Sequence, residues 1–169
     1  ILNNGYYFLN RNSNLTSQYY KKFFFPLDAL RNWNKAYGRK GFYQYQFVVK
    51  KSFAYEVIEE VIKILKMYNQ KPVLGVLKTF GKVKSVGMLS FPTEGVTLAI
   101  DIQNKGIKTL KMLDDLDSVI TSCGGRVYPA KDSRMSYSTF LTSFQKFEKF
   151  ENYIDPLFNS SFLSRMRKN

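Results

Sequence analysis

Three charged side chains lie close together near the end of a short predicted strand. A double glycine precedes the segment 126–131, whose composition predicts a strand. Lys131 is the last residue of this segment, and Asp132 and Arg134 follow it. A charge at the end of a buried strand requires a partner, because an isolated charge is costly to remove from water. The run therefore indicates a site for a ligand or partner of complementary charge, unless it forms a solvated loop.

Two amide side chains lie on one face of another predicted strand. The segment 41–49 is rich in aromatic and β-branched residues, and its period of two places Gln44 and Gln46 on the same face. Amides bond hydroxyl and carbonyl groups without carrying a charge, so this face suits an uncharged sugar or polyol. The alternative is that both glutamines lie on a solvent-exposed sheet face.

The residue types that are missing exclude several kinds of chemistry. The chain has no histidine, so catalysis by Ser-His or Cys-His pairs is excluded, and we expect no bound metal. Cys123 is the lone cysteine, so no internal disulfide can form. Neither G-x-G-x-x-G nor G-x-x-x-x-G-K-[ST] occurs, and nucleotide binding by this chain alone is therefore not expected.

The formal net charge of +13 indicates an anionic partner: nucleic acid, anionic lipid or a phosphate-bearing ligand. The alternative explanation is composition, because the lysines are scattered among many Asn, Ile, Phe and Tyr residues, as in proteins encoded by AT-rich genomes. No apolar run approaches the length of a membrane span, and the first residues lack a signal-peptide pattern. With the single cysteine, these features predict a cytoplasmic protein and leave peripheral membrane contact open.

The elements that would position these residues follow a regular order. Residues 1–22 show no sustained period and predict an arm or connection, and a short helix with Trp33 in the core is expected before Gly38. Beyond it we expect two strand–helix–strand units and then a third helix. Their predicted bounds are 41–49, 52–69 with Ser52 as N-cap, 72–81, 95–103, 106–122, 126–131 and 137–154.

This order predicts an α+β, ferredoxin-like fold (βαββαβ): an antiparallel four-stranded sheet with two helices on one face, plus an N-terminal arm and a C-terminal helix. Within the helix 106–122, Ile107 is expected on the buried side and Asp117 outside. The other face of the sheet is free to receive a ligand or a second domain. The polar side chains predicted on that face are Gln44, Gln46, Lys78, Thr97 and Asp101.

Five motifs occur in an order that resembles a known family. They are FFPLDALRNWNKAYGRKGFYQYQFVV, VLKTFG, LSFP, AIDI and GGRVYPAKDSR, and together they extend over residues 23–168. The set resembles the C-terminal half of the FAD-linked sugar and aldonolactone oxidoreductases of the vanillyl-alcohol-oxidase superfamily. The resemblance implies that residues 23–169 form a substrate-binding, or cap, domain. It also implies that an FAD-binding domain lies N-terminal in the full protein and is absent from this chain, which begins without Met.

The resemblance implies oxidation of a secondary alcohol of a sugar or polyol, or of an aldonolactone, with hydride transfer to flavin. A polyprenylphosphoryl sugar is among the substrates that it suggests. Lys131 would approach the flavin and the substrate as the catalytic residue, and Tyr128 would line the ring pocket as a second cofactor contact. On this interpretation the flavin is the missing partner of the charged run. The implied substrate-binding residues are Gln44, Gln46, Leu74, Val76, Lys78, Phe80, Thr97 and Ala99.

Some positions depart from the family pattern, and one role is left open. Thr97 and Ala99 stand where mycobacterial members carry Asn and Cys, and Phe24 stands where they carry Tyr. The departure puts an identical substrate in question and predicts insensitivity to inhibitors that trap the cysteine. No residue is singled out as the general base, because Lys131 suits either charge stabilisation or proton transfer.

Two other functional classes remain as alternatives. The fold order, the positive charge and the run from Arg39 to Val48 resemble an RNA-recognition motif, although the aromatic run lies on the first strand where the third is needed. A non-catalytic domain that only binds other chains is the second alternative. Neither alternative explains the ordered motifs that the oxidoreductases share.

Overall fold

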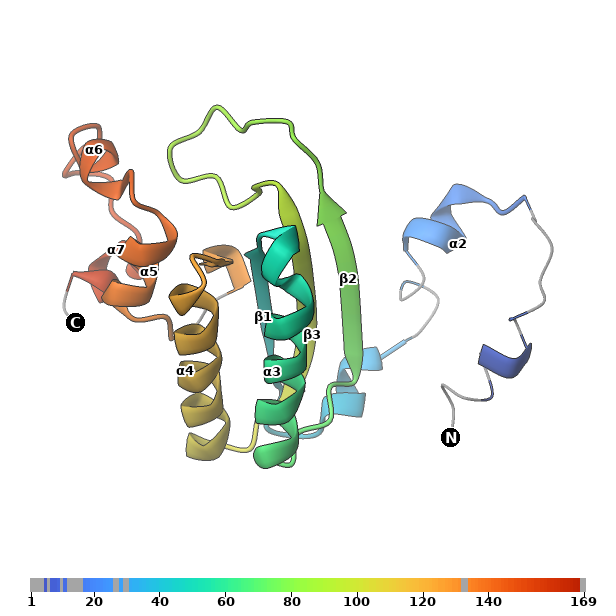
Figure 1. Ribbon diagram of the computed structural model, residues 1–169. Coiled ribbons are helices and arrows are strands. Elements are labelled where there is room, and N and C mark those ends of the chain that lie inside the picture. Colours follow the sequence, from blue (N-terminus) through green and yellow to red (C-terminus); the bar gives the residue numbers. More distant parts are fainter. Residues whose placement is uncertain are drawn as a thin grey trace. The chain divides into compact units, whose positions relative to one another are not determined.

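The computed structural model describes residues 5, 7–9, 11, 17–25, 28, 31–131 and 134–167, and the chain divides into two compact units, 1–36 and 37–169. The first unit contains the short helix α2 (Tyr20–Phe24), and a 3-10 turn, η2 (Trp33–Tyr37), spans the boundary (Figure 1). Phe23 and Phe24 lie in α2. Trp33 is 39% exposed, so the expectation that it is a core residue is wrong.

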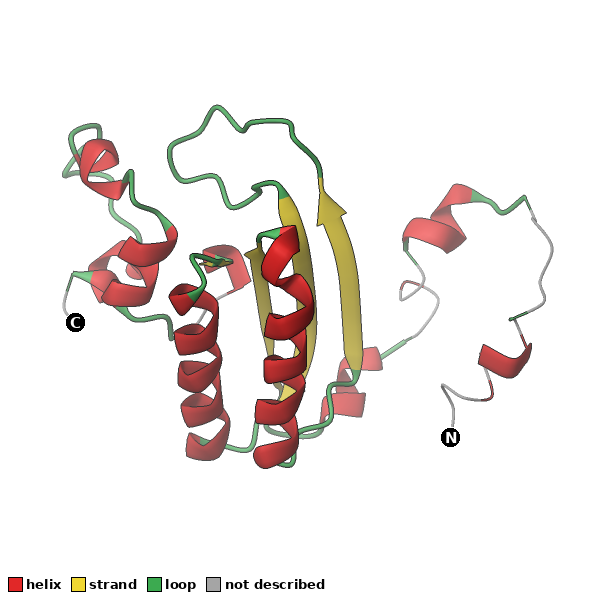
Figure 2. Cartoon of the chain, viewed as in Figure 1, coloured by secondary structure: helices red, strands yellow, loops and turns green. Residues whose placement is uncertain are grey.

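The second unit contains an antiparallel sheet of four strands: β1 (Phe42–Val49), β2 (Leu74–Phe80), β3 (Gly95–Gln103) and β4 (Arg126–Val127). The strand order is β2-β3-β1-β4, and every neighbouring pair is antiparallel. Two helices, α3 (Ala54–Met67) and α4 (Ile107–Ser122), lie side by side on one face of the sheet (Figures 1 and 2). The predicted ferredoxin-like α+β fold is confirmed.

The core lies between these two helices and the sheet. Apolar residues at helical spacing face inward from α3 and α4, and alternate residues of β1 and β3 meet them, as the period-two pattern requires. Each of these side chains leaves water on folding, which is the main favourable contribution to stability. The buried contributors are Val57, Val61, Ile64, Leu65, Met112, Leu113, Leu116, Ile120, Tyr45, Phe47, Val49, Ile100 and Ile102.

Several predicted element ends are wrong. Ser52 does not cap α3, because it lies within a preceding 3-10 turn, η3 (Lys51–Phe53), and the helix begins at Ala54 without a side-chain cap. The last strand ends at Val127 instead of 131. Tyr128 N still donates to Gln46 O at 2.8 Å, but Pro129 has no N–H and opens the 3-10 turn η4 (Pro129–Lys131).

The single predicted helix 137–154 is divided into α5 (Tyr137–Ser143) and α6 (Phe147–Glu151), and a further helix, α7 (Ser161–Met166), lies in the tail. The chain leaves helical geometry at Phe144, whose φ is −131°. The break allows Phe140, Phe144 and Phe147 all to be buried. The packing of these aromatic rings therefore stabilises the chain more than an uninterrupted helix would. In α4, Ile107 is 73% exposed and Asp117 is buried, the reverse of the expectation.

Two glycines offer a test of the β1–β3 pairing. A Cβ at Gly95 would overlap the backbone carbonyl of Val49, which cannot move without disturbing the strand pair, whereas a Cβ at Gly81 meets nothing. We expect Gly95→Ala to lower the free energy of unfolding by about 1–3 kcal/mol. Gly81→Ala should leave it unchanged or raise it by less than about 1 kcal/mol. Urea denaturation compares them, and equal effects of both substitutions would contradict the steric argument.

Candidate functional site

The residues expected to line a substrate cavity share one face of the sheet. Gln44 pairs with Asp101 and Gln46 with Ala99 across β1 and β3. Residues directly opposite in an antiparallel pair project to the same side, and that side is opposite the core residues of the same strands. We call the sheet face away from α3 and α4 the outer face. The predicted residues that the register places there are Gln44, Gln46, Leu74, Val76, Lys78, Phe80, Thr97 and Ala99.

Asp101 lies buried on the outer face with two neutral donors. The Tyr37 hydroxyl donates to Asp101 Oδ2 at 2.7 Å, and Gln44 Nε2 donates to Oδ1 at 2.9 Å. Burial, followed by this hydrogen bond and the carboxylate charge, raises the pKa of Tyr37 from 10.0 to about 12. Tyr37 was not expected at the site. Its only sequence signal was its place in the first shared motif, since it precedes β1 and reaches Asp101 through tertiary packing.

The second glutamine is also held within the sheet. Gln46 Nε2 donates to Thr97 Oγ1 at 3.0 Å, and both side chains are buried. The amide nitrogens of Gln44 and Gln46 are thus occupied. Within the described part of the chain, no donor is seen on either amide oxygen. These oxygens can accept hydrogen bonds from hydroxyl groups of a ligand that approaches the outer face.

Aromatic side chains cover one end of the outer face. The rings of Phe91 and Tyr128 stack at 4.4 Å with an interplanar angle of 26°, and Phe80 meets Phe91 edge-on at 6.1 Å. Arg126 Nη1 donates to Ser90 O at 2.9 Å and fixes the connecting loop 82–94 beside β4. Tyr128, whose backbone N–H bonds Gln46 O, lies on the same side of the sheet as Gln46. Phe91 is an additional site residue, and the LSFP motif was the signal that could have identified it.

Lys131 lies at the β4 end of the outer face, in η4. It borders a narrow cleft with Gln44, Gln46 and Tyr128, so the structure brings together residues that lie far apart in the sequence. Tyr45, Leu113 and Arg134 line the same cleft from the helix side. Burial lowers the pKa of the Lys131 ammonium; the Asp101 charge opposes this shift, and the Lys78 charge adds to it. The cleft has a volume of only about 10 Å³. The described residues alone therefore do not enclose a ligand-sized pocket at Lys131.

Arg134 belongs to a different network on the helix side. Its guanidinium bonds Asp117 at 2.9 Å and Asp114 at 2.8 Å, and also reaches Leu113 O at 2.9 Å. The Tyr45 hydroxyl donates to Asp117 Oδ1 at 2.9 Å. The expectation that one ligand partners the whole charged run is therefore wrong for Arg134, whose partners come from α4. Asp132 lies outside the described residues.

Comparison with known proteins identifies two bacterial relatives of the chain. No protein-family model matches the chain. The decaprenylphosphoryl-beta-D-ribose oxidase of Mycolicibacterium smegmatis is 38% identical over 132 residues. The chain is related to part of this oxidase. The match covers 78% of this chain and 27% of the relative, so the chain spans only part of that protein's length. The resemblance indicated by the ordered motifs is confirmed.

A shorter match points to a second bacterial protein. The "Uncharacterized protein in mprA 5'region" of Streptomyces coelicolor is 43% identical over 61 residues, which are 36% of this chain and 16% of that protein. Its name assigns no activity. This match therefore adds nothing on activity.

The raised pKa of Tyr37 predicts a pH dependence of stability. Because the folded-state pKa lies above the ordinary value, the folded chain gains stability from this group below pH 10.0 and loses it as pH rises to about 12. We expect the free energy of unfolding of wild type to fall across this interval more steeply than that of Tyr37→Phe. Urea denaturation at each pH measures the difference, and Tyr55→Phe, which removes an exposed hydroxyl, should retain the wild-type slope.

The Arg134 network predicts a large stability effect that is independent of ligand. Arg134→Ala would leave the buried Asp117 carboxylate without its charged partner, and we expect a cost of about 3–5 kcal/mol. The matched control is Arg167→Ala, which breaks the more exposed ion pair with Glu151 and should cost less than about 1 kcal/mol. Thermal or urea unfolding of both variants checks this. Similar losses in the two variants would mean that burial does not set the strength of the Arg134 network.

Proposed function

We propose that residues 23–169 form the substrate-binding, or cap, domain of an FAD-dependent oxidoreductase that oxidises a secondary alcohol of a sugar or polyol. One observation carries the proposal: Lys131 and Tyr128 border the same cleft as Gln44 and Gln46. This cleft lies along the part of β1 that β4 does not cover, and Tyr45, Leu113 and Arg134 line it from the helix side. The name of the M. smegmatis relative, an oxidase of a ribose derivative, supports the same class of reaction. The proposed substrates include aldonolactones and polyprenylphosphoryl sugars.

The outer face has the properties of one wall of a substrate chamber. The oxygens of Gln44 and Gln46 can accept hydrogen bonds from sugar hydroxyls and fix the orientation of the ring. Lys131, with its lowered pKa, can take the hydroxyl proton or stabilise negative charge near the reacting carbon. FAD, bound mainly by a domain outside this chain, would supply the acceptor for the substrate's hydride. A wall with a cleft of about 10 Å³ fits this division, because it requires a second surface.

The chemistry of the outer face favours this proposal over RNA binding. RNA-recognition sheets stack bases on aromatic side chains of their central strands. On the outer face, the central strands β1 and β3 instead carry Gln44, Gln46, Thr97, Ala99 and Asp101 in their middle section. Amides and a buried carboxylate suit a polyol better than stacked bases. A salt-dependent RNA shift assay separates the two functions, because an oxidoreductase domain should show only weak, sequence-independent binding.

The proposal is tested first by the colour of the protein. The full reading frame is expressed and purified, and its visible spectrum is recorded before and after addition of sugars and polyols without oxygen. A yellow protein that bleaches with one of these compounds supports the oxidoreductase. A colourless protein that does not take up added FAD would contradict it and favour a non-catalytic interaction domain.

Lys131 provides the sharper test in the same full-length protein. Lys131→Ala should slow the reduction of bound flavin by about a hundredfold or more, because both candidate roles need the amine. Lys71→Ala is the control, since Lys71 is exposed and distant in sequence from the cleft. Stopped-flow absorbance measures the rate after equal flavin occupancy has been verified. Unchanged reduction in Lys131→Ala would remove this residue from the mechanism.

Lys131→Arg distinguishes the two roles of the amine. A guanidinium keeps the positive charge but does not accept a proton in this pH range. If Lys131 is the base, wild-type flavin reduction should rise with pH up to the lowered pKa of the amine, and Lys131→Arg should be slow at every pH. If Lys131 only stabilises charge, Lys131→Arg should recover most of the wild-type rate.

A further inference from the structure

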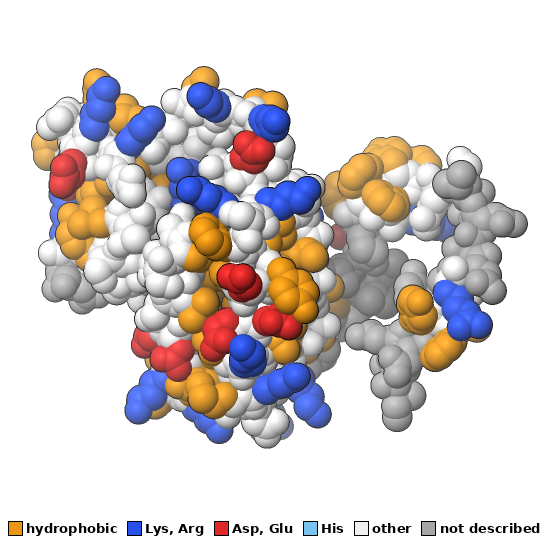
Figure 3. Space-filling model, viewed as in Figure 1, with side chains coloured by type: hydrophobic (Ala, Val, Ile, Leu, Met, Phe, Trp, Pro, Cys, Tyr) orange, Lys and Arg blue, Asp and Glu red, His pale blue; other side chains and the backbone are white. Residues whose placement is uncertain are grey.

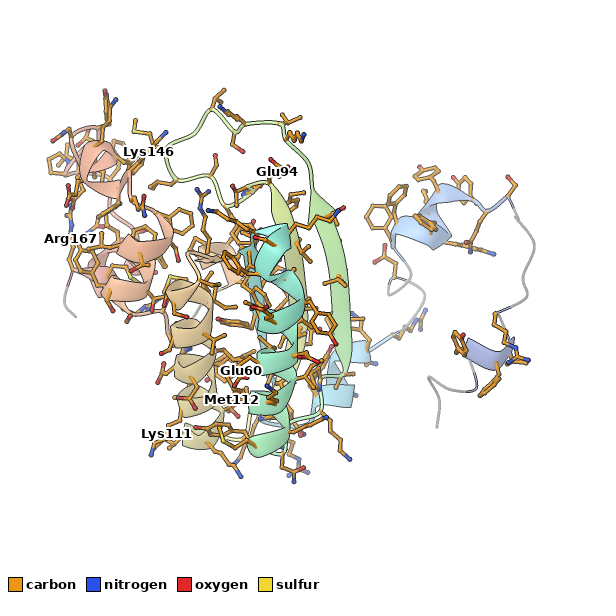
Figure 4. All side chains as sticks on the ribbon, viewed as in Figure 1. Glu60, Glu94, Lys111, Met112, Lys146 and Arg167 are labelled. Atoms are coloured by element: carbon orange, nitrogen blue, oxygen red, sulfur yellow. The ribbon has the colours of Figure 1, made fainter. Side chains whose placement is uncertain are left out.

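A second hollow lies beside the outer face, between the connecting loop 82–94 and the segment that joins α5 to α6. Its volume is about 670 Å³, far larger than the cleft at Lys131. We call it the basic groove. Figure 3 shows Lys and Arg side chains at this end of the unit and again at its opposite end, with acidic side chains between them. In Figure 4, Lys146 at α6 and Glu94 before β3 mark the two sides of this region.

The charges that line the basic groove are strongly unequal. Glu94 is the single carboxylate among its lining residues, whereas the cations are Lys50, Lys82, Lys84, Arg126 and Lys146. The four lysines are exposed, and among the residues that the structure describes none of them forms an ion pair. Like charges collected around one hollow repel each other and create a positive potential there. The groove therefore favours occupation by an anion.

The neutral groups in the basic groove indicate which anion fits. Ser85, Ser90 and Thr93, which carry side-chain hydroxyls, are among the lining residues beside the cations. Hydroxyl, ammonium and guanidinium donors together are typical of sites for phosphate, whose oxygens accept several charge-assisted hydrogen bonds. A volume of about 670 Å³ accommodates a phosphate together with part of the molecule that carries it.

One residue joins the basic groove to the sheet. Arg126 pairs with Val48 in the β1–β4 ladder, which places its side chain on the outer-face side, and its Nη1 donates to Ser90 O in the loop. Its guanidinium is therefore held in place by the fold. The lysines from the loop, from the end of β1 and from α6 converge on the same hollow from separate elements. The fold, rather than a local run of sequence, assembles the charge.

We propose that the basic groove binds the phosphate group of a phosphate-bearing ligand. The inference does not depend on the proposed oxidoreductase function. The phosphate can belong to a soluble ligand or to a lipid headgroup at a membrane surface, since both present the same oxygens. Among the described residues, none of the helices has the length and apolar character of a membrane span.

The test uses the full-length protein and two variants with equal change of charge. In the groove variant, Lys82, Lys84 and Lys146 are replaced by Gln; in the control variant, Lys66, Lys108 and Lys111 are replaced by Gln. The control lysines are exposed and lie on α3 and α4, and Lys111 is at the opposite end of the unit from Lys146 (Figure 4). Calorimetry with inorganic pyrophosphate measures affinity, and thermal unfolding verifies that both variants are folded.

We expect the groove variant to bind pyrophosphate about tenfold or more weakly than wild type, because it lacks charged donors, and the control variant to bind within about twofold of wild type. Equal weakening in both variants would mean that only total charge matters and would overturn the proposal. Absence of saturable pyrophosphate binding by wild type would overturn it as well. Tighter binding of single-stranded RNA than of pyrophosphate, lost in the groove variant, would replace the small phosphate ligand by nucleic acid.

A second experiment, with lipid vesicles, identifies the source of the phosphate. Phosphatidylcholine vesicles with and without phosphatidylglycerol are sedimented with wild type and the groove variant. Binding that requires phosphatidylglycerol, is lost in the groove variant and is competed by pyrophosphate supports the proposal with a lipid headgroup as ligand. Pyrophosphate binding without vesicle binding supports it with a soluble phosphate ligand. Because neither assay uses flavin, a failure here is distinct from a failure of the oxidoreductase proposal.

Discussion

The register of β1 against β3 is the constraint on which both the core and the candidate site depend. Tyr45 and Phe47 face the helices, while Gln44 and Gln46, at the positions between, face away. A slip of one residue would turn the amides into the apolar core and expose the aromatic rings. The same ladder of hydrogen bonds therefore separates the apolar side of the sheet from the polar outer face, and the cost of burying an unpaired amide helps to fix it.

Two buried carboxylates lie on opposite sides of this sheet and are satisfied in different ways. Asp117, on the helix side, is paired with the Arg134 guanidinium and the Tyr45 hydroxyl. Asp101, on the outer face, receives hydrogen bonds from the neutral Tyr37 and Gln44. On the helix side, the charge of Asp117 is thus balanced by Arg134 of the same chain. The outer face keeps a carboxylate whose charge raises the pKa of the Lys131 ammonium against the effect of burial.

The connecting loop 82–94 has a part in both proposed sites. Phe91 packs on Tyr128 and closes one end of the outer face, while Lys82 and Lys84 line the basic groove. Arg126 holds the loop through Ser90 and borders the groove itself. A ligand with a sugar or polyol at the outer face and a phosphate in the groove would contact both sides of this loop. The two proposals are independent in their tests but adjacent in the fold.

The order of elements and the faces of the strands were determined by the sequence alone. Apolar period two and period 3.6 are local properties, so they predicted the βαββαβ order and placed Gln44, Gln46, Lys78, Thr97 and Ala99 on one face. The family resemblance came from ordered motifs in the same way. Element ends were less well predicted, because Ser52 and Phe144 take conformations that depend on what packs around them.

Only the tertiary structure decided which charges meet. Arg134 stands three residues from Lys131 in sequence and lines the same cleft, but its ion pairs are with Asp114 and Asp117 of α4. Tyr37 reaches Asp101 across 64 residues, and the cations of the basic groove come from separate elements. Pairing of charges follows distance and burial in space, and neither quantity is a function of local periodicity. For that reason the sequence could place candidate residues on one face of the sheet, and the fold assigned their partners.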